Sequence, residues 1–100
     1  MRVEIPFWDM FKDPMLRGDK VMTTRSKKYG NKGDIFDKFG ATFRISLVKK
    51  LPIALIANEF YDAEGFDTRE DFIKIWEKIH PIIGYQPEKE YWCHLFALIV

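Results

Sequence analysis

The chain has little of several features that define specialised protein classes. Cys93 is its only cysteine, which excludes an internal disulfide framework. No apolar run approaches the roughly 20 residues that a membrane span requires. The first ten residues, MRVEIPFWDM, lack the apolar core and small-residue cleavage site of a signal peptide. We therefore expect a soluble, cytoplasmic protein without a membrane partner.

The chain also lacks internal repeats, low-complexity tracts and linkers, so we expect residues 1–100 to form one domain. At 47% hydrophobic and 16% aromatic residues, 100 residues are enough for one core. His80, Cys93 and His94 do not have the spacing of metal ligands. We expect no metal and no cofactor, and we favour a monomer.

The net charge of +1 conceals an uneven distribution. Residues 1–50 carry 12 Lys or Arg and 6 Asp or Glu, a balance of +6, whereas residues 51–100 carry 4 and 9, a balance of −5. A positive half is a common feature of proteins that bind anionic ligands. Alternatively, the two halves fold against each other and neutralise their charges. Charge alone does not separate these interpretations.

The first half of the chain predicts one helix followed by strands. A helix over residues 7–17 would end at Gly18, acting as its C-terminal cap. Residues 20–25 have strand-like β-branched character, and a turn cluster follows. Residues 34–39 and 41–51 read as two further strands. In the second of these, Phe43, Ile45 and Leu47 alternate with polar residues, which is typical of a half-buried strand.

The second half predicts helices and a closing strand. Residues 52–66 suggest a short helix or loop. Residues 67–80 form the clearest helix, with Thr68 as N-cap and an apolar stripe of Phe72, Ile75, Trp76 and Ile79. Residues 91–100 form a long, mainly apolar run, YWCHLFALIV, which we expect as a strand in the middle of a sheet. The order of elements indicates an α+β fold with a mainly antiparallel sheet, open or closed into a small barrel.

The segment GDKVMTTR, residues 18–25, is the strongest candidate for chemistry. If residues 21–25 form a strand, Thr23 and Arg25 share one face and Lys20 can swing towards them, whereas Thr24 faces the core or a neighbouring strand. Arg25 and Lys20 could clamp a phosphate or carboxylate. Alternatively, a Lys20 with a lowered pKa could take the proton of Thr23 and make it a nucleophile. A solvated basic hairpin is the simplest alternative.

Glu64 is a second candidate, because it precedes a glycine between an apolar segment and a capped helix. It could face the cationic residues and protonate a leaving amine or hold Lys20 in place. In the simpler interpretation it is a surface acid like Glu59 and Asp62.

Aromatic and basic residues around this segment complete the set of candidates. Trp8 and Tyr29 are the aromatic residues that we would place at the mouth of a cleft, whereas Trp76 is expected in the core. Lys27, Lys28 and Lys32 would extend a cationic rim that attracts phosphates without base specificity.

The segment also fits the pattern G-x-K-x-x-x-x-R and thereby resembles the signature of ASCH domains, which belong to the PUA-like superfamily. GDIF at 33–36, AEGF at 63–66, the following helix TREDFIKIW and the closing strand LFALIV resemble further features of the family in the same order, covering about residues 7–100. Two positions depart from the family pattern. Val21 stands where Thr is common, and Thr24 stands where an apolar residue is usual.

The resemblance implies a small β-barrel with flanking helices and a basic cleft beneath the turn at Gly18. It implies RNA or nucleotide binding there, by Gly18, Lys20 and Arg25 together with the rim of Lys27, Lys28 and Lys32. Some small members of the family are amidohydrolases that deacylate modified cytidines such as N4-acetylcytidine. Carried over by motif, their catalytic residues correspond to Lys20, Thr23 and Glu64.

Two hypotheses follow from the sequence. The first, which we place slightly ahead, is a binding module for RNA or a small nucleotide or nucleoside. Its affinity would fall with salt and survive Thr23→Ala. The second is an amidohydrolase whose turnover would be lost in Lys20→Ala, Thr23→Ala and Glu64→Ala.

Overall fold

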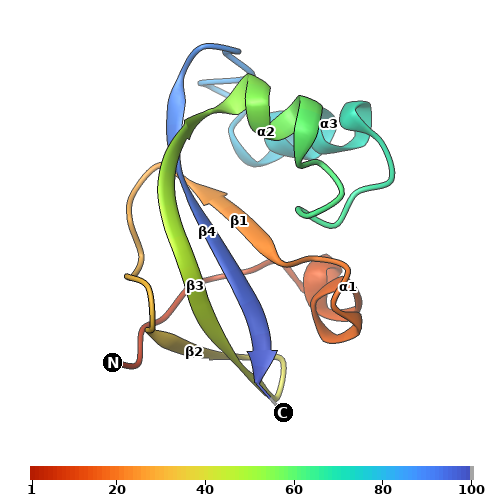
Figure 1. Ribbon diagram of the computed structural model, residues 1–100. Helices are drawn as coiled ribbons and strands as arrows, with labels where there is room; N and C mark the ends of the chain where they lie inside the picture. The colour runs from red at the N-terminus through yellow and green to blue at the C-terminus, as the bar shows by residue number, and fades with distance from the viewer. Residues whose placement is uncertain (100) are drawn as a thin grey trace.

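The computed structural model describes residues 1–99, which form one curled antiparallel sheet with three helices (Figure 1). The elements in chain order are η1 (Asp9–Phe11), α1 (Lys12–Arg17), β1 (Met22–Arg25), β2 (Ile35–Lys38), β3 (Ala41–Pro52), α2 (Ile53–Glu59), α3 (Arg69–Ile79) and β4 (Glu90–Ile99). In Figure 1 the three helices lie to the right of the long strands β3 and β4, with β1 between α1 and the α2–α3 pair. This is the predicted α+β class.

The strand order is β1-β4-β3-β2, and all neighbouring strands are antiparallel. The last predicted strand therefore lies in the middle of the sheet, as its apolar sequence indicates; Val100 lies outside the described residues. The sheet curls into a half-barrel, and β1 and β2 are its edge strands. The N-terminal segment partly covers the β2 edge, where Val3 N–H donates to the Ile35 carbonyl at 2.8 Å.

A β-bulge in β3 changes which side chains face the core. Ile45 pairs with Phe96, but Leu47 pairs with Leu95, so Ser46 is an extra residue in this strand. The extra residue moves Leu47 to the opposite face, where it is 50% exposed, while Ile45 is fully buried. The predicted alternation is confirmed for Ile45 and wrong for Leu47, because a one-residue shift reverses every later side chain.

The sheet buries an apolar cluster on each face. One cluster is rich in phenylalanine, and Phe36, Phe43 and Phe96 pack there with ring centroids 5.2 to 5.5 Å apart. The other contains Trp76 and Tyr91, whose rings meet edge to face at 4.7 Å. Alternate residues of β4 supply both clusters because successive side chains of a strand point to opposite faces.

Local signals in the sequence explain the ends of two helices. Gly18 adopts a φ of +83° and caps α1, which allows Asp19 and Lys20 to donate their N–H groups to the Pro14 carbonyl. Thr68 caps α3 by accepting the Asp71 N–H at 3.1 Å. The predicted helix over residues 7–17 is shorter than expected and begins as the 3-10 turn η1. Among residues 1–99, no helix is both long enough and apolar enough to span a membrane.

Candidate functional site

A cleft of about 270 Å³ lies between the N-terminal segment, β1 and α3. Its walls are largely aromatic: the N-terminal segment and η1 contribute Phe7, Trp8 and Phe11, and the loop before α3 and α3 itself contribute Phe66, Phe72 and Trp76. Polar side chains in and next to β1, and one in the loop before α3, also line it: Lys20, Thr23, Thr24, Arg25, Ser26 and Glu64. The segment 18–25 is therefore part of a cleft and does not form a solvated hairpin.

The backbone holds Lys20 and Glu64 side by side although they are 44 residues apart. The two residues form an isolated antiparallel bridge, and Val21 N–H donates to the Ala63 carbonyl at 2.8 Å. Gly65 permits this approach: its φ is +97°, and a Cβ added there would lie 3.0 Å from the Cβ of Lys20. The AEGF segment thus needs glycine for both its conformation and its contact with Lys20.

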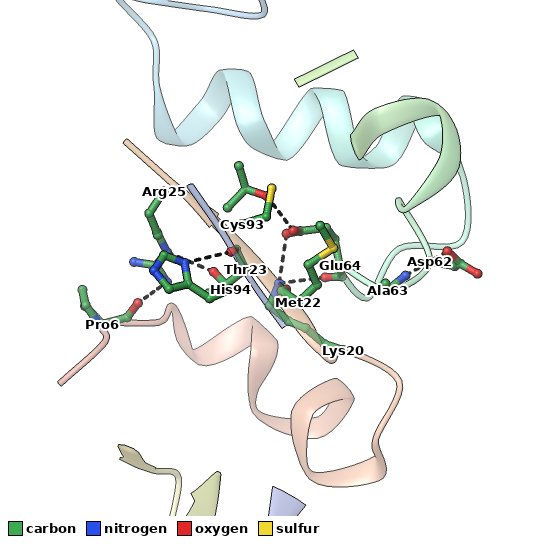
Figure 2. A network of polar contacts seen from close by, with 11 residues as sticks. Pro6, Lys20, Met22, Thr23, Arg25, Asp62, Ala63, Glu64, Cys93 and His94 are labelled. Carbon is green, nitrogen blue, oxygen red and sulfur yellow. Dashed lines mark hydrogen bonds and ion pairs between the residues drawn. The ribbon is translucent and has the colours of Figure 1, made fainter. Parts of the chain in front are cut away.

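The Lys20 ammonium is buried and fully hydrogen-bonded. Its Nζ donates to the carbonyls of Met22 at 2.8 Å and Glu64 at 2.9 Å, and to Glu64 Oε1 at 3.3 Å (Figure 2). These three bonds use all of its protons. Burial lowers the pKa of Lys20, whereas the charge of Glu64 and its hydrogen bond act in the opposite direction. The result is a buried ion pair at the base of an aromatic cleft.

Thr24 contacts the other oxygen of the same carboxylate. Its hydroxyl donates to Glu64 Oε2 at 2.8 Å, so Glu64 is held between an ammonium on Oε1 and a hydroxyl on Oε2. On the far side of Thr24, Cys93 Sγ lies 3.7 Å from Oγ1. Burial raises the pKa of the Cys93 thiol to about 12, which keeps it protonated and makes it a packing residue.

Thr23 and Arg25 form a separate pair on the other face of β1. Arg25 Nε donates to Thr23 Oγ1 at 3.0 Å, and the guanidinium also donates to the Pro6 carbonyl, as Figure 2 shows. The same guanidinium lies over the Phe7 ring, 4.8 Å from its centroid. Burial lowers the pKa of Arg25. The strand alternation predicted that Thr23 and Arg25 share a face, and this is where they lie.

Of the residues predicted for the site, Lys20, Thr23, Arg25 and Glu64 line one cleft, but in two pairs. Lys20 bonds to Glu64, and Thr23 bonds to Arg25. Gly18 does not line the cleft and acts through the cap of α1. The predicted rim residues, Lys27, Lys28 and Lys32, are exposed and lie outside the lining. The charged lining residues are Lys20, Arg25 and Glu64, which gives the cleft little excess charge.

Sequence reasoning missed several residues of the cleft. Thr24 was assigned to the core or to a neighbouring strand, yet its hydroxyl reaches Glu64, because the loop before α3 covers that face of β1. Trp76 was expected in the core, where it is buried, and it also lines the cleft together with the rest of the apolar stripe of α3. Trp8 and Tyr29 line the cleft as expected at its mouth, and Trp8 is 44% exposed.

His94 is a further residue whose position the sequence did not reveal. It is fully buried on β4, accepts the Tyr29 N–H on Nε2 at 3.0 Å, and has Nδ1 3.4 Å from the Thr23 carbonyl. A ring that accepts on Nε2 carries its proton on Nδ1, which defines a neutral tautomer. His94 therefore joins β1 to the segment that presents Tyr29. Among residues 1–99, no group of three His, Cys, Asp or Glu side chains is arranged to hold a metal ion.

No protein-family model and no curated protein matches the sequence. Solved structures share its fold. An ASCH domain from Lactobacillus crispatus JV V101 is similar over 97% of this chain and 78% of its own, with a TM-score of 0.68 and 13% identity. Hypothetical protein PH0355 is similar over 99% of this chain and its full length, with a TM-score of 0.75 and 13% identity. Protein EF3133 from Enterococcus faecalis V583, a DUF984 structure, is similar over 90% of this chain and 70% of its own, with a TM-score of 0.64 and 20% identity.

Because the sequence identities are only 13 to 20%, these comparisons establish a similarity of fold alone. The curled antiparallel sheet and its helices define an α+β fold of the PUA-like type. More particularly, the chain has the fold of an ASCH domain, and the resemblance predicted from the GDKVMTTR signature is confirmed at this level.

Proposed function

We propose that the cleft binds the base of a nucleoside or nucleotide, either free or within RNA. One observation carries the proposal: aromatic walls enclose a buried hydrogen-bonding array of Lys20, Glu64 and Thr24. A flat heterocycle stacks on aromatic rings, and its N–H groups can donate to the lone pairs that the Glu64 carboxylate and the Thr24 hydroxyl oxygen still have free. The near balance of charge in the lining suits a neutral base better than a polyphosphate.

The proposal is tested by calorimetric titration with cytidine, uridine, adenosine and guanosine and their monophosphates. Removing Lys20 alone would leave Glu64 charged and buried, so the appropriate variant is the double substitution Lys20→Met with Glu64→Gln, which removes both charges. We expect this variant to lose roughly 10-fold or more in affinity, because charge-assisted hydrogen bonds are the strongest contacts of the site. Lys74→Met, at an exposed position of α3, is the matched control. Absence of binding to every nucleoside and monophosphate would contradict the proposal.

A second candidate function is hydrolysis of an acylated exocyclic amine, such as that of N4-acetylcytidine. It is favoured by the Thr24 hydroxyl, which donates to the Glu64 carboxylate of the Lys20–Glu64 pair, and by a second cleft hydroxyl on Thr23. A threonine Oγ would attack the acyl carbon, and the carbon–nitrogen bond would break. The hydroxyl proton would pass by way of Glu64 to the leaving amine, and water would then hydrolyse the acyl-threonine to a carboxylic acid. The positive charge of Lys20, whose protons are already engaged, would stabilise the developing oxyanion electrostatically.

Thr23→Val and Thr24→Val form a matched pair for this reaction, because each removes one hydroxyl at nearly constant volume. Of the two threonines, Thr24 donates to Glu64 and thus has the base that a nucleophile requires, whereas the family resemblance assigns the nucleophile to Thr23. Release of cytidine from N4-acetylcytidine, followed by chromatography, identifies which hydroxyl is needed. We expect the essential substitution to lower turnover by at least about 100-fold. Equal turnover in both variants and the parent would exclude this mechanism.

A further inference from the structure

A second hollow, of about 120 Å³, lies between strands β1, β3 and β4 and the segment that follows α2. All but one of the side chains that line it are apolar: Met22, Leu47, Leu51, Phe60, Ala63, Cys93 and Leu95, with Lys49 as the exception. We call these residues the apolar groove. None of them lines the cleft, so the groove is a separate surface.

The groove presents apolar side chains to solvent. Leu47 is 50% exposed and Phe60 is 38% exposed. Leu47 lies on this face because of the bulge at Ser46, which pairs it with Leu95 of the groove; without the extra residue it would point to the same face as the buried Ile45. An apolar patch that a local irregularity turns towards solvent indicates a contact surface.

Charges of opposite sign flank the apolar residues. Lys49 is exposed on the β3 side of the groove. Glu59 and Asp62 are exposed on the other side, next in sequence to Phe60 and Ala63, which line the groove. Within residues 1–99, none of these three charged side chains belongs to an ion pair. They are therefore available to a second molecule.

We infer that a second copy of this chain covers the apolar groove, in a dimer with two-fold symmetry. A two-fold contact joins the same patch of both subunits, so this patch must be complementary to itself. The groove combines a projecting leucine with a hollow, and a cation with two carboxylates. In the dimer, Leu47 packs into the hollow of the partner, and Lys49 lies beside Glu59 and Asp62 of the partner subunit.

The size of the groove sets the strength of the contact. Stable dimers bury roughly 800 Å² on each subunit, and a contact built around one small hollow lies at the low end of this range. The dimer is therefore weak, and it replaces the monomer expected from the sequence at high protein concentration. Because it uses no residue of the cleft, the inference does not depend on the proposed function.

The test is sedimentation velocity of the full chain at about 5 to 500 µM and low salt, where ion pairs are screened least. We expect the parent to change from monomer to dimer over this range. Leu47→Arg should raise the dissociation constant at least about 10-fold, because it places a charge in the apolar contact. Leu98→Arg is the matched control and should behave like the parent. Leu98 is 37% exposed and pairs with Phe43, on the face of β4 opposite to the groove.

Charge reversal tests the two-fold arrangement. Lys49→Glu is one variant, and Glu59→Lys with Asp62→Lys is the other. Each should raise the dissociation constant roughly 5- to 30-fold, because like charges then meet in both symmetry-related contacts. An equimolar mixture of the two variants should dimerise as tightly as the parent, since both contacts in the mixed dimer join opposite charges. Circular dichroism checks that every variant is folded.

Three results would overturn the inference. The parent could remain a monomer at about 500 µM, which means that the groove does not bind a second copy. The parent could dimerise equally well with Leu47→Arg, which places the interface elsewhere. The mixture could fail to restore a dimer that each charge variant weakens, which means that Lys49 does not face Glu59 and Asp62 of the partner subunit. Nucleotide binding in the cleft is measured separately and stands or falls without these results.

Discussion

Glu64 combines burial, charge and a fixed pair of partners in one side chain. It is 4% exposed and Lys20 is 2% exposed, so neither charge is screened by water. A buried ion pair gains little net stability, but removing one member leaves the other charged in a low-dielectric site. The pair therefore matters more for fixing the orientation of the carboxylate than for the free energy of folding.

We expect Lys20→Met to lower the free energy of unfolding by about 3 to 5 kcal/mol, because Glu64 then remains buried without its counter-charge. The double variant with Glu64→Gln should recover most of this loss. Urea denaturation followed by circular dichroism measures both. Equal destabilisation of the single and double variants would mean that packing, and not charge, accounts for the effect.

A second prediction at this scale concerns Gly65. Gly65→Ala is expected to lower the free energy of unfolding by about 2 to 4 kcal/mol, because it adds a contact with Lys20 to the strain of a positive φ. Gly33→Ala is the matched control: its φ is +93°, but nothing lies within 4 Å of an added Cβ. Its cost should be about 1 kcal/mol. If the two substitutions cost the same, close packing against Lys20 is unimportant.

At the residue scale, the sequence predicted which side chains lie in the cleft better than it predicted which of them hydrogen-bond to each other. The strand period correctly put Thr23 and Arg25 on one face. It could not reveal that the AEGF loop covers the opposite face of β1, because that contact joins residues about 40 positions apart. Thr24 was consequently assigned away from the site although it bonds directly to Glu64.

At the scale of secondary-structure elements, His94 links β4 to β1 and to the segment that presents Tyr29. Burial lowers the pKa of His94 in the folded state, and the nearby charges of Arg25 and Lys28 lower it further. A histidine in the unfolded chain has a pKa of about 6.5. The unfolded state therefore binds the proton more readily, and this contribution to stability is lost as the pH falls below that value.

We expect the free energy of unfolding to decrease between pH 7 and pH 5 and this slope to be smaller in His94→Gln. His80→Gln is the control, since His80 is the chain's other histidine and lies at the end of α3. Chemical denaturation at several pH values measures the slopes. A slope unchanged by His94→Gln would assign the pH dependence to other groups.

Elements with strong periodicity were predicted well, and local irregularities were not. The helix capped by Thr68 and the central position of the last strand follow directly from apolar patterning. The bulge at Ser46 does not, because nothing in the alternating sequence distinguishes an extra residue from a paired one. The bulge exposes Leu47, and predicting that exposure would have required knowing the register between β3 and β4.

At the scale of the whole molecule, the positive residues 1–50 and the negative residues 51–100 do not neutralise each other through ion pairs. Among residues 1–99, four ion pairs form, and only Lys20–Glu64 joins residues 1–50 to residues 51–100. The interpretation in which the halves neutralise each other is therefore weak. The excess positive charge of the first half is therefore not used up by ion pairs with the second half.

The position of β4 gives a prediction for the whole fold. β1 and β3 both pair with β4 and not with each other, so a chain of residues 1–88 lacks the strand that joins them. We expect this chain to be unfolded, with no near-ultraviolet circular dichroism and little dispersion in its proton NMR spectrum. A dispersed spectrum would show that the core forms without the last strand.

The same arrangement has a consequence for the protein as it leaves the ribosome. The residues of the cleft lie in the first 80 positions, yet the strand that holds β1 against the sheet is made after them. Until β4 has emerged, the nascent chain therefore has exposed aromatic side chains, and the edges of β1 and β3 that will pair with β4 remain unpaired. Because chaperones act on exposed apolar surface and unpaired strand edges, we expect the chain to depend on them most during this interval.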